Sequence, residues 1–171
     1  MIEELDFNIA PLLGILRNAE VLYRPYSLHN QLSIQCSDLS EDTRIRLSAS
    51  CGSFKRQNVS RRDEEFKFLN PEFSILLPYI KIIESKLDKS IRRLRLMKLL
   101  PKTCLSYHKD ECEKRVHMVI NTNPNAMFVC EGVVYTMPTA GNVYTLRTNV
   151  RHTAINASYD TPRIHLVGSL I

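Results

Sequence analysis

Two segments of the sequence, Arg115-Val116-His117-Met118-Val119 and Arg163-Ile164-His165-Leu166-Val167, are almost alike and decide the fold. Successive side chains of a β-strand point to opposite faces, so Arg and His share one face of each strand and the apolar residues at the even positions share the other. The simpler interpretation is a sheet with one solvated face. If the face lies inside a barrel, its two arginines require an anion, because a buried unpaired guanidinium is very costly.

Short β-type runs separated by turn residues fill the sequence after Ser90. They are predicted at 93–100, 104–108, 115–121, 126–130, 133–137, 143–146, 152–157 and 163–170. Glu131-Gly132 is a hairpin signal between two of them. Many short strands at this spacing predict a β-sandwich or a small barrel.

The first 90 residues show other patterns and are expected to support the β-region. A short helix is predicted over 9–19, a half-buried strand over 28–36 and mostly loop over 37–66. Asn70-Pro71-Glu72 is typical of a helix start, and Pro78 is expected to kink or split the helix that follows. Because no linker divides the chain, residues 1–171 are expected to form a single domain, with 1–90 packed on 91–171.

Composition excludes several protein classes. The 171 residues are 44% apolar, which suffices for one well-buried core. Only 5 glycines and no glycine-rich phosphate-binding motif argue against a dinucleotide fold or a phosphate loop. An acidic N-terminus without a long apolar run argues against export or membrane insertion, and 5 cysteines without a Cys-x-x-Cys pair favour a cytoplasmic compartment.

The positive charge is concentrated in the second half of the chain. Residues 1–90 hold 12 Lys and Arg against 13 Asp and Glu, whereas residues 91–171 hold 11 against 5. This half, with Arg92, Arg93 and Arg95, suggests a basic nucleic-acid-binding module as one alternative. The sequence has no Trp and no aromatic ladder for base stacking, which argues against that alternative.

One group of residues could bind a metal ion. His108 and Asp110 are spaced so that both lie on the same side of an extended chain, and His152 begins a strand further on. Two His and one carboxylate form the facial set associated with non-haem Fe(II). The simpler interpretation of His108-Lys109-Asp110 is an exposed turn.

A competing metal set combines Cys104, His108 and Cys112, but their spacing does not match common zinc-ligand spacings. Cys104 and Cys130 are instead expected to be small core residues.

Four segments together carry a family resemblance: Tyr107–Asp110, Arg115–His117, Thr148–Asn156 and Arg163–Leu166. They resemble the aspartyl/asparaginyl β-hydroxylase family of 2-oxoglutarate oxygenases, and cis-3-proline hydroxylase is similar in the same segments. The resemblance covers roughly residues 94–171. It implies a mainly β protein with supporting N-terminal helices, built on a double-stranded β-helix, the cupin-type jelly roll.

The resemblance also implies a site and an activity. The implied Fe(II) ligands are His108, Asp110 and His152, and the implied residues for the cosubstrate 2-oxoglutarate are Arg163, Arg115 and His117. Arg163 corresponds to the family's arginine that binds a carboxylate of 2-oxoglutarate. The implied reaction uses O2 to hydroxylate an amino acid or an Asp/Asn-type protein side chain.

Several alternatives stay open at this point. A non-catalytic cupin-like binder of a small anion would keep the same pocket, and neither the substrate nor the oligomeric state is indicated. His165 is interpreted either as support for the site or as a core histidine. The 37–66 loop, with Arg56, Arg61 and Arg62, could be a lid, a peptide groove or a solvated loop.

Overall fold

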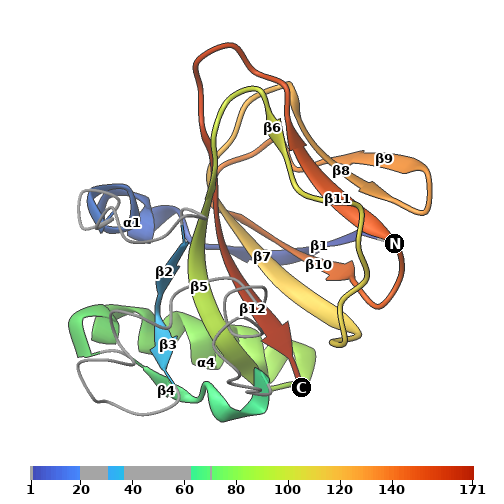
Figure 1. Ribbon diagram of the computed structural model, residues 1–171. Helices are drawn as coiled ribbons and strands as arrows, with labels where there is room; N and C mark the ends of the chain where they lie inside the picture. Colours follow the sequence, from blue (N-terminus) through green and yellow to red (C-terminus); the bar gives the residue numbers. More distant parts are fainter. Residues whose placement is uncertain (1, 20–30, 37–62, 70) are drawn as a thin grey trace.

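The computed structural model describes residues 2–19, 31–36, 63–69 and 71–171, and two antiparallel sheets face each other in it (Figure 1). The larger sheet has the strand order β1-β10-β7-β12-β5-β2. Its strands are β1 (Ile2–Asn8), β2 (Gln31–Ser33), β5 (Ile91–Leu99), β7 (Lys114–Asn121), β10 (Asn142–Arg147) and β12 (Arg163–Leu170). Neighbouring strands come from distant parts of the sequence, as in a jelly roll.

The smaller sheet has the order β6-β11-β8-β9 and covers one face of the larger sheet. Its strands are β6 (Thr103–Cys104), β8 (Ala126–Cys130), β9 (Val133–Thr136) and β11 (His152–Asn156). A short pair, β3 (Gln35–Cys36) with β4 (Phe68–Leu69), forms a separate sheet beside β5, to which the Gln35 side chain is hydrogen-bonded. The predicted class, a cupin-type jelly roll with N-terminal helices, is therefore confirmed.

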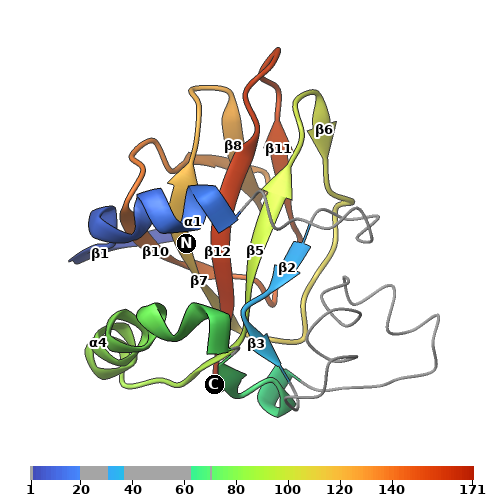
Figure 2. The same ribbon diagram turned by 90° about the vertical axis from the view of Figure 1, so that its left-hand side faces the viewer.

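Helices cover the outer face of the larger sheet (Figure 2). They are η1 (Ala10–Leu12), α1 (Leu13–Ala19), η4 (Pro71–Leu76) and α4 (Leu77–Leu87), and a 3-10 turn, η3 (Asp63–Glu65), precedes β4. The helical stretch is divided into η4 and α4. The non-helical backbone lies at Phe73, and Pro78 stands in the first turn of α4, where its missing N–H is harmless. No helix in the described residues is long and apolar enough to span a bilayer.

Two apolar cores lie on opposite faces of the larger sheet. The outer core joins Leu16 and Ile83 of the helices to Leu96, Met118 and Leu166 of the sheet. The inner core lies between the two sheets and includes Val119, Phe128, Tyr144, Leu146 and Ala154. Because side chains alternate along β7 and β12, one face of each strand contributes apolar residues to the outer core. The other face points into the space between the two sheets.

The strands with the clearest alternation were predicted to the residue or nearly so, including β8 and β12. The N-terminal strand β1 was not predicted, because Glu3, Glu4 and Asp6 interrupt the alternation of apolar and polar residues. Charged residues are common on edge strands such as this one. With β2 it adds two strands from the first 90 residues to the larger sheet, so these residues do more than support the β-region.

Two other predictions need correction. The predicted strand 104–108 shrinks to β6; beyond it the Leu105 N–H still donates to Ala154 O at 2.9 Å, and strand pairing resumes at the His108 bridge. The predicted strand 28–36 is two short strands, β2 and β3, on different sheets, and its residues 28–30 lie outside the described part, as do residues 37–62 of the predicted loop.

Candidate metal centre and anion pocket

His108 and His152 are brought together by backbone pairing. The two residues form an isolated antiparallel bridge, with the His152 N–H donating to His108 O at 2.7 Å and the His108 N–H donating to His152 O at 3.0 Å. Their rings lie 4.5 Å apart between centroids. The bridge therefore holds the side chains of His108 and His152, which are 44 positions apart in the sequence, next to each other on the same face of the paired segments.

Both imidazoles are oriented by their Nδ1 atoms. His108 Nδ1 lies 2.7 Å from Ser106 O, and His152 Nδ1 lies 2.8 Å from Val150 O. A carbonyl oxygen can only accept, so each Nδ1 carries a proton, and Nε2 is the nitrogen left for a metal when the ring is neutral. This is the arrangement found in metal-binding histidines, where a hydrogen bond at one ring nitrogen fixes the other as a ligand.

Asp110 brings a carboxylate to the same point. Its Oδ1 lies 3.5 Å from His108 Nε2 and its Oδ2 lies 3.7 Å from His152 Nε2. One ligand atom from each of the three residues lies within 4.8 Å of the other two. Two imidazole nitrogens and one carboxylate fit a divalent transition metal such as Fe(II), the ion expected from the sequence.

The charges of these groups are set by their surroundings. Burial would raise the pKa of the Asp110 carboxyl, but the hydrogen bond with His108 and the positive Arg115 lower it to about 2. The hydrogen bond with Asp110 raises the pKa of His108, whereas burial lowers the pKa of His152. Asp110 is thus an anion at neutral pH, as a metal ligand must be.

Arg115 connects this centre to a second carboxylate. Its Nε lies 2.8 Å from Asp110 Oδ2, and its Nη2 lies 3.9 Å from Asp63 Oδ2. Asp63 also binds Arg93 Nη1 at 2.7 Å and accepts a hydrogen bond from Ser169 Oγ at 2.5 Å. Burial alone would raise the pKa of the Asp63 carboxyl, but Arg93, Ser169 and Arg115 together lower it.

A buried cluster of one arginine and two histidines occupies the interior behind the metal centre. Arg163, His117 and His165 extend inward from β12 and β7, and His165 is completely buried. Arg163 Nη2 lies 3.0 Å from His165 Nδ1, and His117 Nδ1 lies 3.3 Å from the same atom. Burial lowers the pKa of Arg163 to about 10, so this side chain stays a cation at neutral pH. Phe128 lies between the two groups, stacked on His152 at 5.3 Å and edge-on to His117 at 6.2 Å.

Contacts link the six residues predicted for the site in two groups: His108, Asp110, His152 and Arg115 at the metal centre, and His117 and Arg163 around His165. Asp63 was not predicted, because its partners are 30 and 106 positions away in the sequence and only the fold brings them together. Arg93 and Arg95, two of the three arginines that suggested a nucleic-acid-binding module, are buried, which weakens that alternative. The sequence feature that could have predicted this burial is the pair Leu94 and Leu96, which alternates with the two arginines and lies on the opposite face of β5.

The cysteine alternative finds no support among the described residues. Cys104 is exposed, and the Cys112 thiol lies 2.9 Å from Lys114 O. Within the described ranges, the His108, Asp110 and His152 cluster is the one group with metal-binding geometry. Cys130 is buried as expected, but the expectation of a buried Cys104 was wrong, because β6 lies at the edge of the smaller sheet.

The fold and the site define a jelly-roll protein with an oxygenase-type arrangement of two histidines and one carboxylate. The profile of the aspartyl/asparaginyl beta-hydroxylase family matches residues 53–171. The chain belongs to this family of hydroxylases. A search of curated proteins finds no match.

Solved structures show the same fold at low sequence identity. An oxidoreductase of the 2OG-Fe(II) oxygenase family from Burkholderia pseudomallei is 13% identical, with a TM-score of 0.60 over 99% of this chain and 84% of its own. IDO from Bacillus thuringiensis is 12% identical, with a TM-score of 0.53 over 99% and 92% of the two chains. AviO1 from Streptomyces viridochromogenes is 12% identical, with a TM-score of 0.52 over 98% and 89%.

Proposed function

We propose that this protein is an Fe(II)- and 2-oxoglutarate-dependent dioxygenase that hydroxylates an amino acid or an Asp/Asn-type side chain of a protein. The carrying observation is that His108, Asp110 and His152 present three ligand atoms within 4.8 Å of one another. The family and its oxygenase neighbours support this proposal at the level of a hydroxylase. When bound, Fe(II) would supply the oxidative chemistry that couples O2 and 2-oxoglutarate to insertion of oxygen into a C–H bond.

Each residue of the site has a role in this proposal. His108 and His152 would hold the metal through Nε2, and Asp110 would add a negative ligand whose orientation Arg115 maintains. Arg163 would bind a carboxylate of 2-oxoglutarate by charge-assisted hydrogen bonds. Arg115 and His117 would line the path between them. The buried interior would exclude water from the reacting groups.

The first experiment needs no substrate. Under anaerobic conditions, Fe(II) and 2-oxoglutarate are added to the metal-free protein, and the visible charge-transfer band of a metal-chelated keto acid is recorded. We expect the band in the wild type and in Lys109→Ala, because Lys109 is exposed although it stands between two ligands. We expect its loss in His152→Ala.

A folded wild type without this band would overturn the dioxygenase proposal. Calorimetric titration with 2-oxoglutarate would then decide whether the alternative, a non-catalytic binder of small anions, applies. That alternative keeps the cationic interior of Arg163 and Arg115 but gives His152 no role. Retention of 2-oxoglutarate binding in His152→Ala without metal would favour it.

A further inference from the structure

His165 has a protonation state that its neighbours determine. Its Nδ1 lies 3.0 Å from Arg163 Nη2, and an arginine can only donate. His165 Nδ1 is therefore an acceptor and carries no proton. Burial holds the pKa of His165 well below its usual range, so the ring is neutral and its proton must be on Nε2.

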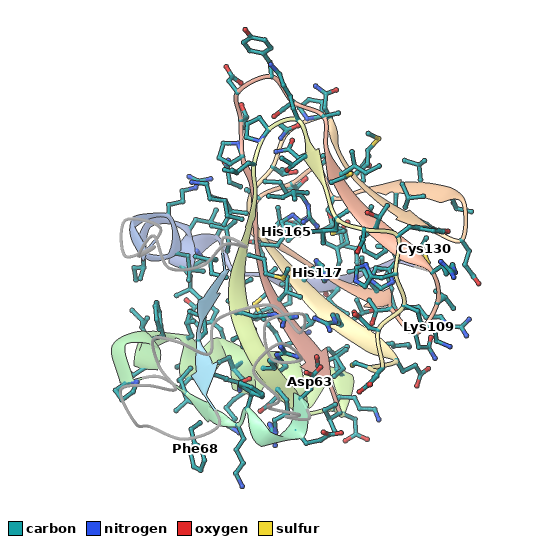
Figure 3. The ribbon with its side chains drawn as sticks, viewed as in Figure 1. Asp63, Phe68, Lys109, His117, Cys130 and His165 are labelled. Atoms are coloured by element: carbon teal, nitrogen blue, oxygen red, sulfur yellow. The ribbon has the colours of Figure 1, made fainter. Side chains whose placement is uncertain are left out.

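The tautomer of His117 follows from that of His165. The two Nδ1 atoms lie 3.3 Å apart, and their rings meet edge-on with centroids 5.6 Å apart. Two lone pairs at that distance would repel, so His117 Nδ1 carries a proton and donates to His165. A single acceptor atom of His165 thus orients both Arg163 and His117. Figure 3 labels His165 and His117 in the interior of the roll.

The other nitrogen of His165 has no such partner. Nε2 is buried and makes no hydrogen bond to any described residue. A buried donor left unpaired is expensive, and in native proteins nearly all such atoms meet an acceptor. Its position on the inward face of β12, two residues from Arg163, places the donor within the cationic interior.

We propose that His165 is a ligand-binding residue whose Nε2–H donates to a carboxylate oxygen of the anion held by Arg163. This inference rests on the proposed function for the identity of the anion as 2-oxoglutarate, although the donor geometry does not depend on it. An anion oxygen would complete the hydrogen bonding of His165 and lie beside the Arg163 charge. His165 would then do two things, since Nδ1 orients Arg163 and Nε2 contacts the ligand.

Two substitutions separate these contributions. Asn places its amide oxygen near the position of Nδ1, so His165→Asn can keep the acceptor for Arg163 but removes the Nε2–H. Gln places its amide nitrogen near the position of Nε2, so His165→Gln keeps a donor for the ligand. His165→Leu removes both, and thermal unfolding of each variant reports whether it is folded.

The first measurement is the dissociation constant of 2-oxoglutarate, from anaerobic titration of the Fe(II)-loaded protein. We expect His165→Asn and His165→Leu to weaken it about 10- to 100-fold, as for loss of a hydrogen bond to a charged group. We expect His165→Gln to weaken it less than His165→Asn, and all three to keep the Fe(II) affinity of the wild type. Affinity for 2-oxoglutarate within twofold of the wild type in folded His165→Asn and His165→Leu would overturn the proposal.

The second measurement uses the metal-free protein and separates this proposal from the proposed function. Long-range proton–nitrogen NMR spectra of the imidazoles should show His165 as the Nε2–H tautomer and His117 as the Nδ1–H tautomer. Addition of 2-oxoglutarate should shift the Nε2–H resonance of His165. That shift in a protein without the charge-transfer band would sustain the anion site and reject the dioxygenase. An Nδ1–H tautomer of His165, or a resonance that 2-oxoglutarate leaves unmoved, would reject the role of His165.

Discussion

Asp110 is the residue on which we expect metal affinity to depend most directly, because it is the one anionic group of the candidate centre. Asp110→Asn keeps the size of the side chain and removes its charge. We expect the dissociation constant of Co(II), used as an air-stable probe, to rise by more than the roughly 10–100-fold that loss of an outer-sphere partner costs. Isothermal titration measures it.

The neighbouring Glu111 provides a matched control for Asp110, since it is an exposed carboxylate one position further along the chain. Glu111→Gln should leave Co(II) affinity within twofold of the wild type. Equal losses in Asp110→Asn and Glu111→Gln would show that Asp110 acts only through general surface charge and is not a ligand.

Asp63 should make stability depend on pH. Its carboxyl has a lowered pKa in the folded protein against an ordinary value of 3.8, so its stabilisation is fully present above pH 4 and is lost as pH falls through the folded pKa. Asp63→Asn should reduce the free energy of unfolding by about 2–3 kcal/mol at pH 7. Urea denaturation of both proteins should show this difference shrinking below pH 3.8.

Asp160 is exposed and serves as the control for Asp63. Asp160→Asn should leave the free energy of unfolding unchanged both at pH 7 and below pH 3.8. A wild-type advantage over Asp63→Asn that persists unchanged to pH 2 would mean that the ion pair with Arg93 is not its source.

At the level of the elements, β12 is packed closely on both faces. A Cβ added at Gly168 would lie 2.6 Å from Ile91 Cγ2 and 3.1 Å from Leu94 Cδ1, two residues of the outer core. Gly168→Ala should therefore destabilise the protein by about 1–3 kcal/mol, the usual cost of overpacking. Gly14 of α1 has no atom within 4 Å of such a Cβ, so Gly14→Ala should be neutral or stabilising. Chemical denaturation measures the stability of both variants. Equal stability of Gly168→Ala and Gly14→Ala would contradict the close packing at Gly168.

The elements also show why sequence reasoning succeeded in some places and not in others. The period-two pattern of β7 and β12 is local, so the facing of Arg115, His117, Arg163 and His165 could be predicted from it. Asp63 and Ser169 are 106 positions apart and meet only when the whole roll has folded, so no local sequence pattern predicts their hydrogen bond. Edge strands such as β1 are also hard to predict, because charges that prevent aggregation break the alternation.

The whole molecule is organised by its larger sheet, which receives strands from both ends of the chain. Ile2–Asn8 pairs with β10, and Arg163–Leu170 lies between β5 and β7. Both apolar cores use this one sheet, the outer through Met118 and the inner through Val119. We therefore propose that residues 1–171 form a single domain, because neither core can persist once the sheet is lost.

This architecture predicts one cooperative unfolding transition that metal binding shifts. Far-UV circular dichroism and near-UV tyrosine signals should give coincident urea curves, as in two-state unfolding. Co(II) at about 100 times its dissociation constant should add about 2.7 kcal/mol to the free energy of unfolding, because the ligands converge only in the folded chain. His152→Ala should show the single transition without the metal-dependent shift, since its β11 pairing is made by backbone atoms. Two separated transitions in the metal-free wild type would instead mean that the helices with the outer core and the smaller sheet with the inner core unfold independently.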